Sequence, residues 1–507
     1  MIWGYNRKDF QTQIKGRLFI RIYIFLNICS LIYICAQERE RILKELMGSE
    51  QRVAAETHVL TLPLPFQGHI NPMLQFSKRL ASKGLKVTLL SFTDKEWTKA
   101  AEHGSVNVQI IFDDTLFAEI TDQEDTVYIN NLYATVKRRL PEVVAKHGEC
   151  GYPISCLVYD SLMPWALDIA TELGLLGATL FTQSLAVSNI YYEVHQGKLK
   201  VPVEKTAAAV EGMPPLEIHD LPTFLSDLES YPLLLKLSAG QFSNIGEADW
   251  VFFNTFNSLE DEVLNLMARQ CAIKPVGPTI PSMYTDKRVK DDKDYGLSLF
   301  KPDEESCMKW LDSREPCSVV YVSFGSLSIL GERQMEEIAC GLKMSCHYFL
   351  WVVRETEKEK FPSRFLDETS EKGLVVTWCP QLEVLAHKSV GCFMTHCGWN
   401  STLEALSMGV PMVAMPQWAD QTTNAKFVAD VWRVGVRVKV DEEGIVTGKE
   451  IELRIREVME EETAIEIRKN SEKWEKLAKE AVDEDGSSDK NIQEFVAKLI
   501  CNSTSSS

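Results

Sequence analysis

Polar and aromatic side chains directly follow strand-like apolar segments at seven places in the chain. In a sheet of parallel strands, ligands bind outside the carboxyl ends of the strands, because helix N-termini and adaptable loops meet there. Residues that follow such segments are therefore the first candidates for chemistry. They are His69, Asp160, Thr182, Ser326, Trp378, His396, and the pair Trp418 and Asp420.

The turn after His396 is the most informative of these places. Gly398 allows the backbone to turn tightly there, and Asn400 or Ser401 is expected to cap a short helix. The free N–H groups and the positive dipole end of such a helix suit a phosphate group. Glu404 lies one helical turn beyond Asn400 on the same face, where its carboxylate could accept the two hydroxyls of a ribose. On this turn alone, an ordinary capped helix explains the pattern as well.

A histidine and an aspartate after two strands of the first half could form an acid–base pair. We expect His69 just outside a helix N-terminus, whose positive end disfavours the imidazolium and keeps the ring neutral and basic. Asp160 could hold the proton-bearing nitrogen, fix the tautomer and stabilise the imidazolium as it forms. A lone histidine after a strand is usually structural, so this pair alone does not establish catalysis.

Alternating strands and helices must position these residues. A helix is expected from Asn71 and Pro72 to Leu80, and another over 164–173. The alternation predicts an α/β fold with two similar doubly wound domains, each a parallel sheet covered on both faces. Its predicted strands are 58–64, 86–92, 154–159 and 178–181 in the first half, and 319–324, 349–353, 374–377, 391–395 and 410–415 in the second.

A charged segment without hydrophobic periodicity separates the two halves. The predicted divisions are an N-terminal domain at 47–278, a linker at 279–306, a C-terminal domain at 307–486, and a helix and tail at 487–507. Ser488 or Asp489 is expected to cap the last helix. Its apolar stripe, which is expected to pack back on the N-terminal domain, consists of Ile492, Phe495, Val496, Leu499 and Ile500.

The first 46 residues differ from the rest, because they carry a net charge of +4 in a chain whose total is −18. The apolar run at 22–36 is shorter than the ~20 residues that a membrane helix needs. A signal anchor, a cleaved signal and an extension outside the working protein are all compatible with it. We favour the extension, because Met47 could serve as the initiating methionine just before the first strand.

Composition excludes several classes of protein. The chain has 507 residues, of which 45% are hydrophobic and 25% charged, as in globular proteins of more than one domain. A charge of −18 has the wrong sign for binding nucleic acid through its phosphates. The 13 cysteines are scattered and form no CxxC pair, which favours reduced thiols and a cytoplasmic location.

The 44 residues from Trp378 to Gln421 closely resemble the signature box of plant secondary-product glycosyltransferases. These are the family-1, UDP-sugar-dependent enzymes with two facing Rossmann-like domains, an arrangement called GT-B. The resemblance runs from Thr57 to the C-terminal helix, including 65–75, 159–165 and 321–326. It implies an acceptor-binding N-terminal domain and a UDP-sugar-binding C-terminal domain, with a cleft between them.

The resemblance also implies a role for each matching residue. Trp378 would stack on uracil, Gln381 would lie near the base and ribose, and Glu404 would hold the ribose hydroxyls. The diphosphate would lie against the turn at Gly398 and be held by Ser326, His396, Asn400 and Ser401. The sugar would be contacted by Thr182, Trp399, Asp420 and Gln421. Gln421 at the last position of the box is the family's usual residue in glucose-users, so UDP-glucose is the implied donor.

In this context His69 becomes the expected catalytic base. It would take the acceptor's proton as the oxygen attacks the anomeric carbon in line, while UDP leaves toward the donor-rich helix end. One displacement inverts the anomeric centre. No cofactor or metal is expected. Some metal-dependent glycosyltransferases use an Asp-x-Asp motif, but here the Asp292-Lys-Asp294 pattern lies in the charged linker rather than after a strand.

Two other classes of protein compete with a transferase. A nicotinamide dehydrogenase is excluded because no strand is followed by GxGxxG. A UDP-sugar epimerase and a non-catalytic UDP-sugar-binding protein share the fold class and remain alternatives.

The acceptor is left open by the sequence. Segments 281–289 and 294–300 resemble a subgroup of plant glucosyltransferases that esterify carboxylic acids and that also includes enzymes for triterpenoid hydroxyls. The expected partner is therefore a small apolar aromatic or aliphatic acid, phenol or triterpenoid alcohol, bound by a monomer without stable membrane insertion. Ester and ether products are equally compatible with the pattern.

Overall fold

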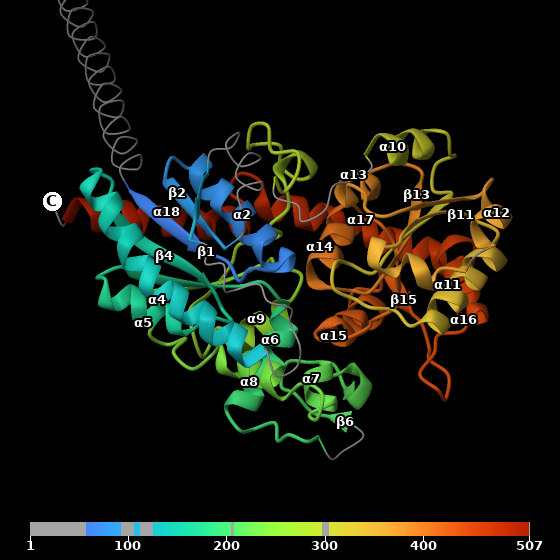
Figure 1. Ribbon diagram of the computed structural model, residues 1–507, viewed down its shortest axis with the longest axis horizontal. Coiled ribbons are helices and arrows are strands. Elements are labelled where there is room, and N and C mark those ends of the chain that lie inside the picture. Colours follow the sequence, from blue (N-terminus) through green and yellow to red (C-terminus); the bar gives the residue numbers. More distant parts are fainter. Residues whose placement is uncertain are drawn as a thin grey trace, which may run out of the picture.

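The computed structural model describes residues 57–92, 106–111, 125–203, 207–296, 304–362 and 364–505. Two sheets of parallel strands lie side by side, each covered by helices, and Figure 1 shows them as the left and right halves of the molecule. This confirms the predicted fold class. The N-terminal extension at 1–46 and the linker residues 297–303 lie outside the described residues.

The first sheet is parallel throughout its main strand order β3-β2-β1-β4-β5-β8-β9. The order reverses between β1 and β4, and open parallel sheets bind ligands outside the carboxyl ends of the strands at such a reversal. The strands are β1 (His58–Leu62), β2 (Lys86–Ser91), β3 (Asn107–Ile110), β4 (Ile154–Asp160), β5 (Leu176–Phe181), β8 (Trp250–Phe253) and β9 (Ile273–Pro275).

The second sheet repeats this plan with the order β12-β11-β10-β13-β14-β15. Its reversal lies between β10 and β13. The register irregularity at His58 and Val59 in the first sheet has a counterpart at Val319 and Val320 in the second. The strands are β10 (Val319–Ser323), β11 (Tyr348–Val352), β12 (Gly373–Val376), β13 (Val390–Thr395), β14 (Met412–Ala414) and β15 (Gly435–Arg437).

All nine predicted strands are confirmed, with ends that differ by at most two residues. Four strands of the two sheets were not predicted: β3, β8, β9 and β15. Each has only three or four residues, too few for a clear alternation of apolar and polar side chains. In addition, β9 contains Lys274 and Pro275, which is tolerated because this strand lies at the sheet edge.

Helices and a small two-stranded sheet surround the main sheets. The N-terminal half contains α2 (Gln67–Ser82), α4 (Asp125–Glu149), α5 (Trp165–Glu172), α6 (Leu185–His195), α7 (Thr223–Ser226), α8 (Pro232–Gly240) and α9 (Asp261–Met267), with the pair β6 (Ala207–Ala208) and β7 (Leu216–Glu217). The C-terminal half contains α10 (Glu304–Asp312), α11 (Glu332–Ser345), α12 (Phe365–Thr369), α13 (Gln381–Leu385), α14 (Trp399–Ser407), α15 (Gln421–Lys426), α16 (Gly448–Met459), α17 (Glu462–Val482) and α18 (Ser487–Ser505).

Each sheet is buried on both faces because its strands are apolar at successive positions. On β1, Val59 packs with α2 and α18, whereas Leu60 packs with α4 and α5 on the other face. On β10, Tyr321 packs with α13, α14 and α17, whereas Val322 packs with α11 and α16. Strands buried on both faces read as continuous apolar runs, which is typical of parallel sheets.

Helix α2 begins at Gln67, so the predicted start at Asn71 and Pro72 is wrong. Pro72 lies inside the helix and has no N–H to donate to Gly68 O four residues earlier. Asn400 Nδ2, from the other domain, donates to this carbonyl oxygen instead, at 2.8 Å. The helix therefore extends upstream of the proline, and His69 lies inside its first turn.

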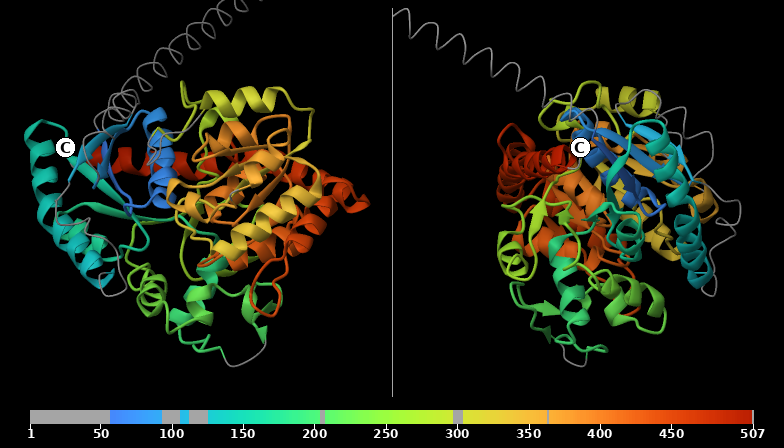
Figure 2. Two further views of the ribbon diagram at one scale, coloured as in Figure 1. Left: turned by 45° about the vertical axis from the view of Figure 1, so that its right-hand side comes forward. Right: turned by 90° about the vertical axis from the view of Figure 1, so that its left-hand side faces the viewer.

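The last two helices cross from the second domain to the first, as Figures 1 and 2 show. Helix α17 packs on α14, and α18 packs on β9 and β4. Helix α18 begins at Ser487, so the prediction that Ser488 or Asp489 caps it is wrong. Ser488 Oγ donates instead to Gly277 O at 2.6 Å. The apolar side chains of α18 thereby complete one face of the first sheet.

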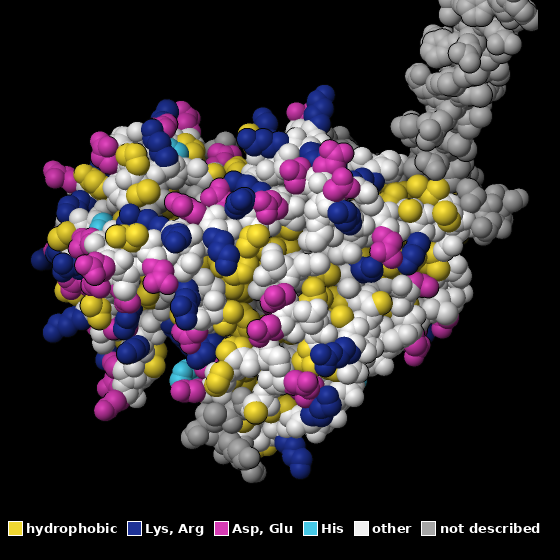
Figure 3. All heavy atoms as spheres, turned by 180° about the vertical axis from the view of Figure 1, so that it is seen from behind, with side chains coloured by type: hydrophobic (Ala, Val, Ile, Leu, Met, Phe, Trp, Pro, Cys, Tyr) yellow, Lys and Arg dark blue, Asp and Glu magenta, His cyan; other side chains and the backbone are white. Residues whose placement is uncertain are grey.

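The surface carries both signs of charge. Figure 3 shows acidic and basic side chains interspersed over one face. Many of them pair locally, as Arg454 does with Glu450 and Glu457 on α16. Within the described part of the chain, no helix is long and apolar enough to cross a bilayer.

We predict that Phe495→Ala destabilises the first domain by about 3–5 kcal/mol, the cost of removing a buried phenylalanine. Its ring is 1% exposed and lies 4.8 Å from the Trp250 ring and 5.0 Å from the Phe252 ring. A lower urea midpoint for unfolding checks this. Ile465→Ala, at a side chain that is 71% exposed, is the control and should leave the midpoint nearly unchanged. Equal midpoints for the two variants would contradict the prediction.

Candidate active site

The first part of the site is a histidine held by a buried carboxylate. His69 Nδ1, in the first turn of α2, lies 2.7 Å from Asp160 Oδ2. Asp160 is the last residue of β4, which pairs with β1 at the point where the strand order reverses. Its Oδ1 accepts the backbone N–H of Leu162 at 3.1 Å. An ionised Asp160 fixes the proton on Nδ1, so Nε2 is the nitrogen left to accept a proton.

Thr182 lies beside this pair. Its Oγ1 is 2.9 Å from His69 Nδ1, so the hydroxyl helps to fix the ring. Thr182 follows β5, the next strand of the sheet. Its expected contact with a sugar stays a prediction.

The pKa of His69 is raised above the ordinary histidine value. The position expected for this residue, beside the positive end of a helix, had suggested a lowered pKa. Burial disfavours the imidazolium, but the nearby carboxylates of Asp160 and Asp420 outweigh it and raise the pKa of the ring. Asp420 comes from the second domain, where burial raises its pKa to about 6 despite a hydrogen bond of 2.7 Å from Asn424. His69 can therefore act as a base only above a pKa that exceeds the ordinary histidine value.

The second part of the site is the N-terminus of α14. Gly398 is the N-cap, so the prediction that Asn400 or Ser401 caps the helix is wrong. The cap makes no side-chain hydrogen bond, and the side chains of Asn400 and Ser401 bond instead to Gly68 O and Gln381 Nε2. Because glycine has no side chain to take up the first N–H groups, this helix end stays suited to an anion.

His396 lies between two glycine turns. A Cβ on Gly398 would be 2.5 Å from His396 Nε2, and one on Gly325 would be 2.6 Å from the same atom. Both glycines are therefore required by the close approach of the ring, and Gly325 also has a φ of 76°. Burial lowers the pKa of His396 to about 4, so the ring is neutral at physiological pH.

Arg354 is a residue of this region that the sequence analysis missed. Its Nη1 donates to Ser326 O at 2.7 Å, and its Nη2 donates to Ser328 O, so the guanidinium fixes the loop after β10. Arg354 follows β11, and the rule that singled out residues after strands would have found it.

The side chains expected at the base and ribose gather beside α14. Gln381 Nε2 donates to Glu404 Oε2 at 2.6 Å and to Ser401 Oγ at 2.9 Å, and Tyr321 OH donates to Gln381 Oε1 at 3.0 Å. Burial raises the pKa of Glu404, which is 4% exposed. Trp378 lies nearby in the chain, half-buried after β12.

Two residues expected at the sugar make contacts within the protein. The indole of Trp399 is buried and donates to Asn254 O of the first domain at 2.7 Å. Gln421 Oε1 accepts the backbone N–H groups of Gln417 and Trp418 at 2.9 and 3.1 Å. The indole N–H of Trp399 therefore joins the domains, and its predicted contact with a sugar stays a prediction.

The acidic residues of the linker hold cations of the protein itself. Asp292 Oδ1 accepts Lys78 Nζ at 2.7 Å, and its Oδ2 accepts the backbone N–H of Ser282 at 2.6 Å. Within the described ranges, no group of three or more His, Cys, Asp or Glu side chains is placed to hold a metal ion.

A histidine–aspartate pair after the strands of one parallel sheet, and a helix N-terminus suited to an anion after those of the other, place this chain among proteins with two Rossmann-like domains. Residues 290–473 match the family model described as UDP-glucoronosyl and UDP-glucosyl transferase. The chain belongs to this family, because its relatives match it over nearly their whole length.

The individual comparisons agree on the family and on the fold. UDP-glycosyltransferase 74E1 of Arabidopsis thaliana is 52% identical over 88% of this chain and 99% of its own length. Mogroside I-E synthase of Siraitia grosvenorii is 50% identical over 88% and 98%. The crystal structure of Os79 from O. sativa in complex with UDP, 39% identical, covers 87% of this chain and 100% of its own with a TM-score of 0.80.

We predict that Gly398→Ala raises the Kd for UDP at least about tenfold, because the new methyl group displaces His396 from between the two turns. Calorimetric titration with UDP checks this. Gly331→Ala is the matched control, since Gly331 is also a helix N-cap with extended backbone but has open space around its Cβ position. Alanine at either cap costs about 1 kcal/mol of stability, so only the change in UDP affinity should separate the two variants.

Proposed function

We propose that this protein transfers glucose from UDP-glucose to a hydroxyl or carboxyl group of a small apolar plant metabolite, with inversion at the anomeric carbon. The observation that carries the proposal is the bond of 2.7 Å between His69 Nδ1 and Asp160 Oδ2, in the first domain, close to α14 and Asp420 of the second. This arrangement sets a base opposite a site that suits a departing diphosphate.

In the proposed reaction, His69 Nε2 takes the proton of the acceptor hydroxyl as its oxygen attacks the anomeric carbon. The bond from this carbon to the diphosphate oxygen breaks, and UDP leaves with the electron pair. The N-terminus of α14 and the neutral His396 stabilise the developing charge. Asp160 stabilises the imidazolium, and a β-glucoside results from the α-linked donor.

The donor would be held by uncharged groups and by the carboxyl groups of Glu404 and Asp420. Trp378 would stack on uracil, Gln381 would contact the base and ribose, and Glu404 would accept the ribose hydroxyls. The diphosphate would lie at Ser326, His396, Gly398, Asn400 and Ser401, and the glucose at Thr182, Trp399, Asp420 and Gln421. We propose no metal or cofactor, because helix-end N–H groups supply the stabilisation that a cation would otherwise give.

Aromatic rings next to the base support an apolar acceptor. The Phe66 ring centre lies 6.4 Å from that of His69 and 6.1 Å from that of Tyr128. Burial raises the pKa of Tyr128 to about 12, so its ring is neutral. If the acceptor is a carboxylate, it carries no proton to remove, and His69 only orients it.

We predict that His69→Ala abolishes at least 99% of transfer to hydroxyl acceptors, because general base catalysis contributes about 10²–10⁴-fold. The assay uses the full chain and a chain that starts at Met47, with UDP-glucose and a panel of aromatic acids, phenols and triterpenoid alcohols. Mass spectrometry identifies products, and alkali-labile products are esters. Transfer that survives EDTA treatment supports the metal-free reaction.

Other outcomes of this assay favour the alternatives. If UDP binds and UDP-galactose forms without any acceptor product, the protein is an epimerase. If UDP-glucose binds and is returned unchanged with every acceptor, the protein is a non-catalytic binder.

We predict that Asp160→Asn lowers kcat/KM for a hydroxyl acceptor by about 10²–10⁴-fold and moves its acid limb to lower pH. The raised pKa of His69 depends on Asp160, and burial alone lowers it. Activity is present above the His69 pKa and lost as pH falls through it, so a lower pKa extends the remaining activity to more acidic pH. A pH profile of kcat/KM for both proteins checks this, and an unmoved acid limb would contradict it.

A further inference from the structure

A tyrosine of the interdomain linker lies inside the proposed nucleotide site. Tyr295 OH donates to Glu404 Oε1 at 2.7 Å, although 109 positions separate the two residues in the chain. Gln381 Nε2 donates to the other oxygen, Oε2, at 2.6 Å. Glu404 is thus held at both carboxylate oxygens, once from its own domain and once from the linker.

The linker around Tyr295 is fixed on the helix that carries His69. Gln75 Nε2 and Lys78 Nζ, both on α2, donate to Asp294 O at 3.2 and 2.8 Å. Lys78 also binds Asp292, at 2.7 Å. The residue before Tyr295 is therefore bound to α2 by two side chains.

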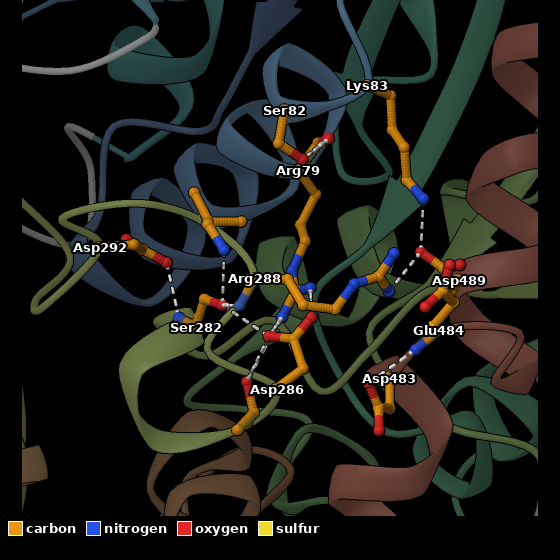
Figure 4. Close-up of polar contacts among 12 residues, drawn as sticks. Arg79, Ser82, Lys83, Ser282, Asp286, Arg288, Asp292, Asp483, Glu484 and Asp489 are labelled. Atoms are coloured by element: carbon orange, nitrogen blue, oxygen red, sulfur yellow. Dashed lines mark hydrogen bonds and ion pairs between the residues drawn. The ribbon is translucent and has the colours of Figure 1, made fainter.

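The same segment is anchored further upstream, as Figure 4 shows. Arg79, the residue after Lys78 on α2, forms a bidentate pair with Asp286, which also accepts Ser282 Oγ at 2.5 Å. Arg288 reaches Asp489 at 3.3 Å, and Lys83 of α2 binds the same carboxylate at 2.7 Å. Paired charges thus hold the linker between α2 and the start of α18.

We propose that Tyr295 is a positioning residue of the nucleotide site, which holds Glu404 toward the ribose hydroxyls and ties that carboxylate to helix α2. The proposal rests on the proposed function, in which Glu404 binds ribose. Tyr295 need not leave when the nucleotide enters, because each carboxylate oxygen has two lone pairs and can accept a second hydrogen bond.

The phenol also favours the charged form of the carboxylate. Burial raises the pKa of Glu404, and the hydrogen bonds from Gln381 and Tyr295 oppose this rise. The other titratable groups that face Glu404 are Tyr321 and Cys379, and burial raises the pKa of both, so they are neutral near pH 7. Asp292, which faces Tyr295, forms an ion pair with Lys78 at 2.7 Å.

The test is calorimetric titration of the full-length Tyr295→Phe variant with UDP between pH 5 and 8. At pH 7 we expect the Kd for UDP to rise about tenfold, which is the size of effect expected when a hydrogen bond to a charged group is lost. We expect kcat at saturating UDP-glucose to change by less than about twofold. Loss of the phenol raises the Glu404 pKa further. Because binding needs the carboxylate and is lost as pH falls through that pKa, affinity should begin to fall at a higher pH than in the unaltered protein.

A second ligand separates positioning from general damage. With 2′,3′-dideoxy-UDP, which lacks both hydroxyls for Glu404, Tyr295→Phe should change the Kd less than twofold. Tyr348→Phe is the matched control and should leave both affinities unchanged. Tyr348 packs on Trp310 and Arg314 and begins β11, so it lies at the amino end of the strand, opposite to the carboxyl ends that form the site.

The outcomes are distinct. An equal loss with both ligands, an unchanged Kd for UDP, or tighter UDP binding by Tyr295→Phe would each overturn the inference. If Glu404→Gln also leaves the Kd for UDP unchanged, the assignment of Glu404 to ribose fails with it. If Glu404→Gln weakens UDP binding and Tyr295→Phe does not, only the role of Tyr295 is lost.

Discussion

The hydrogen bond from Asn400 Nδ2 to Gly68 O joins the two helix ends on which the site is built. It exists because Pro72 leaves that carbonyl without a partner inside α2. The bond sets the first turn of α2, with His69, against the first turn of α14. The proposed base and the helix end suited to an anion, which come from different domains, are thereby held at a fixed separation.

Other hydrogen bonds between the domains support this contact. The indoles of Trp399 and Trp432 donate to backbone oxygens of Asn254 and Leu259 at 2.7 and 3.0 Å. Asp220 of the first domain also pairs with Arg437 of the second at 2.6 Å. Because these contacts use backbone oxygens and a buried carboxylate, they fix the domains without depending on surface charges that salt would screen.

The sequence was sufficient for the fold class because the longer strands are continuous apolar runs, and the residues after them could be found by inspection. The four strands of three or four residues could not be found in this way. The strand ends placed His69 and Asp160 on neighbouring strands, where the structure joins them. The helix starts could not be predicted in the same way. Pro72 is a good first residue of a helix, and the donor that binds the carbonyl group left free by this proline comes from the other domain.

Residues that act through contacts with residues far away in the sequence also could not be predicted. Tyr295 stood in a charged segment without periodicity, and nothing local indicates that its hydroxyl meets Glu404. Thr182 and Trp399 were assigned to the sugar by resemblance, whereas the structure shows their polar atoms in contacts within the protein. Arg354 differs, because it follows β11 and could have been found by inspecting the residues that come after the predicted strands.

The return of α18 to the first sheet has a consequence for how the two halves can be recombined. The chain passes between them twice, once through the linker and once between α17 and α18. The first domain is therefore not one continuous stretch of sequence, because Phe495 and its neighbours belong to its core. A chimera that takes one half from a relative must be spliced at both passages, since a single junction in the linker would pair the first sheet with a foreign last helix.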